Sequence, residues 1–226
     1  MPPVTTPAVL LDLDGTLVDH EAAADAGLRA WLPTLGLPAT DEAVARWAEV
    51  QEVHLAAWRA RTITFAEQRR RRLRDYFGSQ AAPAELDAMF AGYLAHYEAA
   101  WRAYDDVLPA LTALAATGVP VAVLTNGSAQ QQAKKLARTG LSALTGPVFT
   151  PDDLGVAKPE PAAFERACAR WGHSPSAVLS VGDNYAFDVT AARAAGLRAA
   201  HLDRLGAGPH DEPARMTTLH DLPAYL

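Results

Sequence analysis

Four short and mostly apolar runs, each followed by a polar turn, set the architecture that this chain can adopt. They occupy residues 8–11, 119–124, 177–181 and 197–202, with a weaker candidate at 147–149. Runs of this length are typical of strands that are buried on both faces, as in parallel sheets. Helical patterns lie between them at residues 108–117, 128–139, 161–171 and 186–195. Strands that alternate with helices in this way predict an α/β fold built on a parallel sheet.

Residues 18–104 have a different character, with no convincing strand and several helical patterns. Thr64 and Glu67 form a capping box that opens a helix predicted to run to about Phe77, and a further helix is predicted over residues 83–97. The tryptophans of this insert are expected to form its core: Trp31, Trp47, Trp58 and Trp101. We therefore predict two domains, a core of residues 1–17 and 105–226 and an all-helical insert of residues 18–104.

Composition and charge restrict the classes of function. Half of the 226 residues are hydrophobic, which indicates a globular protein with a sizeable core. A net charge of −6, without a dense basic patch outside one short run, argues against nucleic acid as a partner. No apolar run approaches membrane-spanning length and the N-terminus lacks signal-peptide features, so the expected location is the cytoplasm. The single cysteine, Cys168, lies in a helical pattern and is predicted to be a small core residue.

The first apolar run ends in Asp12-Leu13-Asp14-Gly15-Thr16. Two acids at positions i and i+2 of a strand end point to the same side of the sheet, and Gly15 lets the chain turn away sharply. One carboxylate could bind a metal ion and attack a substrate while the other gives or takes a proton. A solvated acidic turn would account for the two acids alone, but their place after a buried strand favours a functional site.

Two further segments have groups that could bind an anion. Thr125-Asn126-Gly127-Ser128 directly follows a predicted strand, and its hydroxyl, amide and backbone N–H groups lie at a helix N-terminus. Such groups form an anion-binding nest, although the same pattern also serves as a helix cap. Lys158 is followed by Pro159 and by a helix that starts near Pro161. It could supply a positive charge, although a lone lysine is also a common surface residue.

The fourth segment, Gly182-Asp183-Asn184-Tyr185-Ala186-Phe187-Asp188, follows the predicted strand at residues 177–181. Asp183 is a natural ligand for Mg²⁺, which takes few protein carboxylates together with water and phosphate oxygens. Asp188 would steady the site from the first turn of the next helix, although both acids could merely favour a helix N-terminus. In open parallel sheets, ligands bind beyond the carboxyl ends of the strands, so segments that are distant in sequence can meet at one site.

The order, spacing and strand-end placement of these segments resemble the motifs of the haloacid dehalogenase-like superfamily. The family motifs DxDGT, a strand ending in Thr or Ser, Lys, and GDxxxxD appear here as DLDGT, LTNG, Lys158-Pro-Glu-Pro and GDNYAFD. The resemblance covers nearly all of the predicted core, and the helical insert is similar to the family's helical cap. It implies a Rossmann-like catalytic core, an all-helical cap and Mg²⁺-dependent hydrolysis of a small phosphomonoester.

The resemblance implies separate roles for the two acids of the first motif. Asp12 would attack phosphorus and form an aspartyl-phosphate, while Asp14 would protonate the leaving oxygen and then activate water. Asp14 is expected to hold a proton at neutral pH, which nearby negative charge favours. Displacement of a halide needs no such acid, and dehalogenases of the superfamily lack an aspartate at this position. Asp14 therefore favours a phosphatase over a 2-haloacid dehalogenase.

The same resemblance assigns the remaining groups of the site. Mg²⁺ and Lys158 would offset the repulsion between a phosphate dianion and the carboxylates, and would stabilise the charge of the transition state. Asp188 would orient Lys158 or a metal-bound water. The implied set is Asp12, the Asp14 backbone carbonyl and Asp183 for the metal, Thr125, Asn126 and Lys158 for the phosphate, and Asp188 and Thr16 in support.

Two positions depart from the family pattern. Asn184 stands where Ser, Thr or Gly is often found and Phe187 where Asn is common. We therefore expect the metal site to be retained with an altered affinity.

Two other functions stay open. A phosphomutase of the β-phosphoglucomutase type shares both aspartates and a helical cap. A non-catalytic binding module is also conceivable, although the intact motif residues argue against it. Sugar phosphates, nucleoside monophosphates and organic-acid phosphates all fit as substrates.

Several charged segments are expected to face solvent. Arg69–Arg72 and Arg74 spread around the helix opened at Thr64, so most of them should be exposed, although one could bind an anionic group of the substrate. Lys134 and Lys135 are predicted to lie on a helix surface. Residues 210–212 belong to a Gly/Pro-rich tail and are expected to be solvated and to form no zinc site.

Overall fold

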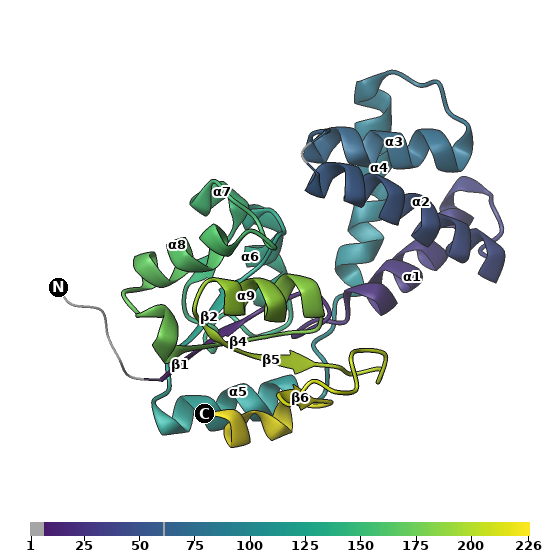
Figure 1. The fold of residues 1–226 in the computed structure, drawn as a ribbon. Coiled ribbons are helices and arrows are strands. Elements are labelled where there is room, and N and C mark those ends of the chain that lie inside the picture. Colours follow the sequence, from purple (N-terminus) through teal and green to yellow (C-terminus); the bar gives the residue numbers. More distant parts are fainter. Residues whose placement is uncertain (1–6, 61) are drawn as a thin grey trace. The chain divides into compact units, whose positions relative to one another are not determined.

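The computed structural model describes residues 7–60 and 62–226, which form two compact units (Figure 1). The core unit consists of the described residues up to His20 together with Arg102–Leu226, and the cap unit is Glu21–Trp101. The cap unit begins and ends three residues inside the expected boundaries of 18 and 104. Val18 still belongs to the core unit because its backbone pairs with that of Asp14 and Ala103.

The core unit is built on a parallel sheet, as predicted. Within the described residues the strand order is β3-β2-β1-β4-β5-β6, and β1 therefore lies between β2 and β4, with Leu11 opposite Val123 and Val181. The loops that follow β1 and its two neighbours consequently meet at the carboxyl edge of the sheet. The strands are β1 (Ala8–Leu11), β2 (Val121–Leu124), β3 (Val148–Phe149), β4 (Val178–Gly182), β5 (Arg198–Leu202) and β6 (Arg215–Met216). Strand β6 was not predicted, because it is only two residues long and contains an arginine.

Helices cover both faces of this sheet (Figure 1), with α8 and α9 on one face and α5 and the C-terminal segment η4 on the other. Cys168 of α8 is 1% exposed within an apolar cluster under α8 and α9, which confirms its prediction as a core residue. The predicted helix at 186–195 is instead a π-helical turn, η3, followed by the short α9. The helical segments are α5 (Val107–Thr117), α6 (Ala129–Arg138), α7 (Pro151–Leu154), α8 (Pro161–Trp171), η2 (Pro175–Ala177), η3 (Tyr185–Thr190), α9 (Ala191–Ala194) and η4 (Leu219–Tyr225).

The cap unit contains helices only, in the part that the structure describes. Thr64 accepts a hydrogen bond from the Glu67 N–H at 3.1 Å, and the helix that it caps ends at Phe77, as predicted. Trp31 and Trp47 pack together in the core of this unit with a ring-centroid separation of 6.1 Å. The segments are α1 (His20–Trp31), which begins one residue before the unit, η1 (Leu32–Leu35), α2 (Asp41–Arg59), α3 (Phe65–Phe77) and α4 (Pro83–Ala99).

Arg72 of α3 departs from the expectation that these arginines face solvent. It is 5% exposed, and its guanidinium carbon lies 4.6 Å from the centroid of the Trp47 ring. It also donates to Gln51 Oε1 at 2.6 Å. A planar and weakly hydrated guanidinium can stack on aromatic rings, which makes its burial tolerable. Burial nevertheless lowers the pKa of Arg72 to about 10. Arg71 is exposed, whereas Arg69, Arg70 and Arg74 are half-buried, so the expectation that most of these arginines are exposed is wrong.

No helix in residues 7–60 or 62–226 combines the length and the apolar character that crossing a bilayer requires.

Candidate active site

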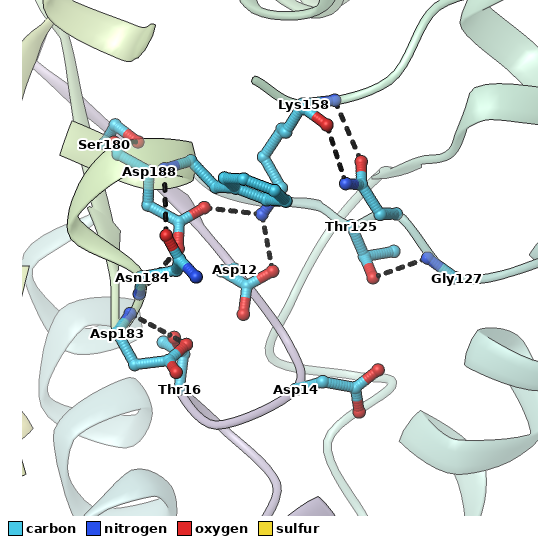
Figure 2. A network of polar contacts seen from close by, with 12 residues as sticks. Asp12, Asp14, Thr16, Thr125, Gly127, Lys158, Ser180, Asp183, Asn184 and Asp188 are labelled. Carbon is cyan, nitrogen blue, oxygen red and sulfur yellow. Dashed lines mark hydrogen bonds and ion pairs between the residues drawn. The ribbon is translucent and has the colours of Figure 1, made fainter. Parts of the chain in front are cut away.

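Asp12, Lys158 and Asp188 form a buried ion-pair cluster at the carboxyl edge of the sheet (Figure 2). Asp12 directly follows β1, and its N–H extends the sheet pairing by donating to the Val181 carbonyl at 2.9 Å. Lys158 Nζ donates to Asp12 Oδ1 and to Asp188 Oδ1, both at 2.6 Å. Burial raises the pKa of Asp12 to about 6, although Lys158 opposes this shift. Burial alone would lower the pKa of Lys158, but the two carboxylates raise it above its ordinary value.

Asp183 lies beside this cluster and is held by the first motif. Its N–H donates to Thr16 Oγ1 at 3.1 Å, and the Thr16 hydroxyl in turn donates to Asp183 Oδ1 at 3.2 Å. Gly15 has a φ of +89°, and a Cβ at this position would lie 2.4 Å from Asp183 Oδ2. Only glycine allows both the backbone turn and the close approach of the carboxylate. Burial, followed by the charges of Asp12 and Asp188, raises the pKa of Asp183 to about 7.

The three carboxylates fit a divalent cation. Asp12, Asp183 and Asp188 each bring an oxygen within 4.8 Å of the others. Burial is the main reason that the pKa values of Asp12 and Asp183 are raised, and neighbouring carboxylates raise them further. Asp188 is also bound through Oδ2 to the Asn184 N–H at 3.1 Å, in addition to Lys158. Carboxylate oxygens are the protein ligands that Mg²⁺ prefers, so a cation here would offset the remaining repulsion.

Asn126 holds the loop that carries Lys158. Its amide donates to the Lys158 carbonyl at 2.8 Å and its amide oxygen accepts the Lys158 N–H at 2.9 Å. The side chain therefore positions Lys158, and its expected role in binding phosphate stays a prediction. Thr125 lies at the end of β2, where its hydroxyl oxygen accepts the Gly127 N–H at 3.1 Å. Its predicted place beside the other motifs agrees with the parallel sheet, because β2 and β1 are neighbours.

The side chain of Asp14 points away from Asp12 (Figure 2). Gln132 Nε2 donates to Asp14 Oδ2 at 2.8 Å, and Lys135 Nζ forms an ion pair with Oδ1. Burial would raise the pKa of Asp14, but Lys135, with contributions from His20 and Gln132, lowers it to about 2. The expectation of a protonated Asp14 is therefore wrong for this conformation, because a cation rather than another acid is its neighbour.

Lys135 was missed by the sequence analysis, which placed it on a helix surface together with Lys134. Lys134 is exposed, whereas Lys135 is only 1% exposed. The available signal was the spacing of Gln132, Lys135 and Leu136, which share one side of a helix at i, i+3 and i+4. Leu136 is 2% exposed and marks that side as the buried one.

Glu212 corrects the expectation that the tail is solvated. It is buried, and Arg193 donates to both of its carboxylate oxygens, at 2.7 Å to Oε1 and 2.9 Å to Oε2. Tyr185, in the last motif, donates its hydroxyl to Oε2 at 3.0 Å. These bonds lower the pKa of Glu212 to about 2, although burial opposes this. His210 and Asp211 are exposed, as predicted.

We expect Glu212→Gln to reduce the stability of the fold at pH 7. The stability of this variant should also fall less steeply than that of wild type as the pH is lowered. A carboxyl group whose pKa is lowered on folding stabilises the fold when ionised, and this contribution is lost as pH falls from about 4.5 towards 2. Loss of the charge-assisted bonds should reduce the free energy of unfolding by about 1–2 kcal/mol at pH 7. Melting curves between pH 3 and 7 test this, with exposed Asp211→Asn as the control. Parallel curves for wild type and Glu212→Gln would contradict it.

Comparison with known proteins relates most of the chain to one family. A family model described as haloacid dehalogenase-like hydrolase matches residues 6–196. Phosphoserine phosphatase from Thermus thermophilus is 31% identical over 220 residues, which cover 92% of this chain and 85% of that protein. Phosphoglycolate phosphatase from Escherichia coli O157:H7 is 32% identical over 199 residues, covering 83% of this chain and 77% of that protein.

Solved structures share the fold. The HAD-hydrolase YfnB from Bacillus subtilis, in a magnesium-bound crystal structure, superimposes with a TM-score of 0.81 at 22% identity over 98% of both chains. A dehalogenase superimposes with a TM-score of 0.76 at 24% identity over 98% of this chain and 97% of its own. At such identities the likeness concerns the fold alone. The family model, however, spans most of the sequence and includes all four motifs of the site, so the chain belongs to the haloacid dehalogenase-like hydrolase family.

Proposed function

We propose that this protein is a Mg²⁺-dependent phosphomonoester hydrolase that uses Asp12 as the nucleophile and Asp14 as the general acid and base. One observation carries the proposal. Lys158 Nζ lies 2.6 Å from Asp12 Oδ1 and 2.6 Å from Asp188 Oδ1 in a buried cluster, and the half-buried carboxylate of Asp183 lies beside it. This arrangement brings a fixed nucleophile, a cation and a set of metal ligands to one edge of the sheet. The phosphatase activity of the curated relatives points in the same direction.

The first half of the reaction transfers the phosphoryl group to the protein. A carboxylate oxygen of Asp12 attacks phosphorus, the bond from phosphorus to the ester oxygen breaks, and Asp14 gives a proton to that departing oxygen. Lys158 and the Thr125 hydroxyl bind oxygens of the transferring group and stabilise its charge. The backbone N–H groups after Thr125 belong to the same anion-binding loop. The product of this half is an alcohol and an aspartyl-phosphate on Asp12.

The second half returns the protein to its starting state. The Asp14 carboxylate takes a proton from water, the resulting oxygen attacks phosphorus, and the Asp12–phosphorus bond breaks to release phosphate. The ionised Asp14 of this structure is in the form that suits this role as a base. In the first half, Asp14 donates the proton that it took from water at the end of the preceding turnover.

The residues proposed to hold Mg²⁺ are Asp12 and Asp183 by their carboxylates and Asp14 by its backbone carbonyl, with Asp188 orienting Lys158. When bound, Mg²⁺ supplies the positive charge that lets a phosphate dianion approach these carboxylates. We expect EDTA to abolish phosphate release and added Mg²⁺ to restore it. Asp183→Asn should raise the Mg²⁺ concentration for half-maximal activity by about 10–100-fold. Full turnover in metal-free protein would contradict this assignment.

The identity of the reaction is tested with a panel of substrates. Phosphate release is measured from 4-nitrophenyl phosphate, phosphoserine, phosphoglycolate and N-acetylmuramic acid 6-phosphate, compounds chosen from the names of the curated relatives. We expect hydrolysis of at least one alkyl phosphate. Faster release of halide from 2-haloacids than of phosphate would overturn the proposal. Interconversion of sugar phosphates without net phosphate release would establish a phosphomutase instead.

A further inference from the structure

One side of α6 connects the proposed acid and base, Asp14, with the proposed phosphate-binding hydroxyl, Thr125. Gln132 and Lys135 lie three positions apart on this helix, and each is 1% exposed. Gln132 Nε2 donates to Asp14 Oδ2 at 2.8 Å and to Thr125 Oγ1 at 2.9 Å. Lys135 Nζ pairs with the other carboxylate oxygen of Asp14. All four residues belong to the core unit.

Gln132 fixes the direction in which the Thr125 hydroxyl can donate. A hydroxyl group has two acceptor positions and one hydrogen. The acceptor positions of Thr125 Oγ1 receive the Gln132 amide at 2.9 Å and the Gly127 N–H at 3.1 Å. The hydrogen is therefore directed to a further oxygen, which in the proposed reaction belongs to the phosphoryl group. Gly127 makes room for this contact, because a Cβ there would lie 2.1 Å from Gln132 Nε2.

Lys135 and Gln132 together determine both the place and the rotation of the Asp14 carboxylate. Each of its two oxygens is bound by a donor from a different side chain of α6, so the group cannot rotate without breaking a bond. A lysine this deeply buried is an expensive choice for stability alone, since an apolar residue of similar length would fill the same space without desolvating a charge. Its burial is better explained by its ion pair with Asp14, which fixes the position of that carboxylate.

We infer that Gln132 and Lys135 are positioning residues, which hold Asp14 in register for proton transfer and direct the hydroxyl of Thr125 towards the phosphoryl group. This inference rests on the proposed function. Loss of each of the two residues should have a different effect. Lys135 acts on Asp14 alone, and its loss should affect the proton transfers of Asp14 but not the binding of the phosphoryl oxygens. Gln132 acts on both partners, and its loss should also weaken the stabilisation of the phosphoryl oxygens.

The test compares kcat/KM for two esters, because this ratio reports the steps up to departure of the leaving group. One is 4-nitrophenyl phosphate, whose acidic phenol needs little protonation, and the other is the alkyl phosphate that wild type hydrolyses fastest. We expect Lys135→Met to lower kcat/KM by about 10–100-fold for the alkyl phosphate, as misplacement of a catalytic group does, and by less than about 3-fold for the aryl ester. Gln132→Met should lower both values, and the alkyl value more.

Controls come from the same helix. Lys134→Met and Gln130→Met replace exposed neighbours and should leave both ratios unchanged. Asp14→Asn is the reference for lost acid catalysis and should show the same preference for the aryl ester, to a larger degree. If Asp14→Asn shows no such preference, the proposed role of Asp14 fails. If Asp14→Asn shows it and Lys135→Met slows both esters equally or neither, the inference on Lys135 is overturned.

A double variant separates positioning from loss of folding. Asp14→Asn/Lys135→Met removes both members of the ion pair, so it leaves no uncompensated charge at this place even if Lys135→Met alone does not fold. Residues that act as one unit have non-additive effects. The double variant should therefore have the kcat/KM of Asp14→Asn for both esters. A further loss equal to that of Lys135→Met, or of about 10-fold where the single variant cannot be measured, would overturn the inference.

Discussion

Asp12→Asn is expected to abolish phosphate release, with kcat falling by at least about 10⁴-fold, as loss of a nucleophile does in other covalent mechanisms. The amide has almost the same shape as the carboxylate, and its oxygen can still accept the bond from Lys158 that now measures 2.6 Å. What it lacks is the negative charge that attacks phosphorus. The fold should be retained, because Asp12 is one of three acids whose repulsion Lys158 compensates only in part.

Two measurements check this expectation. Phosphate release from the substrate panel gives the loss of turnover, and acid quenching with ³²P-labelled substrate followed by denaturing gel analysis detects the aspartyl-phosphate. Labelled protein should appear with wild type and be absent from Asp12→Asn. Exposed Asp211→Asn serves as the matched control and should retain both signals. Equal turnover by Asp12→Asn would mean a contaminating enzyme or another nucleophile.

Lys158→Met should reduce both activity and stability. Lys158 is the cation that contacts Asp12 and Asp188, both of which are buried. Loss of one electrostatic group of this kind lowers kcat by about 10²–10³-fold. Removal of one partner from a buried ion pair typically lowers the free energy of unfolding by about 3–5 kcal/mol, because the remaining charges are uncompensated. Saturating Mg²⁺ should restore part of the stability, since it supplies positive charge to the same carboxylates.

The stability of Lys158→Met should also depend on pH with a definite sign. The pKa of Asp12 is already about 6 with Lys158 present, and removing the cation raises it further. An acid whose pKa is raised on folding favours the folded state at low pH, and this contribution is lost as pH rises through the raised pKa. In EDTA, the deficit in melting temperature relative to wild type should therefore be larger at pH 8 than at pH 5. Lys134→Met controls for loss of a surface charge, and an equal deficit at both pH values would contradict the prediction.

Local patterns in the sequence were enough to predict the core unit and the meeting of the motifs. The apolar runs at 8–11 and 177–181 coincide with β1 and β4 to within one residue, because strands buried on both faces are apolar throughout. Once a parallel sheet is accepted, Asp12 and Asp183 must share its carboxyl edge, since each follows one of two neighbouring strands. The insert was recognisable by its helical spacing and by caps such as Thr64.

What the sequence by itself determined is therefore the type of the main elements, their order along the chain, and the edge of the sheet at which the motif residues gather. Only the tertiary structure decided the partners of the charged side chains. Lys135 forms an ion pair with Asp14, which is 121 positions away in the sequence, and Glu212 forms one with Arg193, 19 positions away. Arg72 stacks on the ring of Trp47, which belongs to another helix. Helical periodicity says that a lysine, glutamate or arginine lies on some side of an element, whereas its burial depends on a partner that compensates its desolvation. That partner comes from a distant segment, so the ionisation of Asp14 and the positioning role inferred for Lys135 follow from packing and not from local sequence.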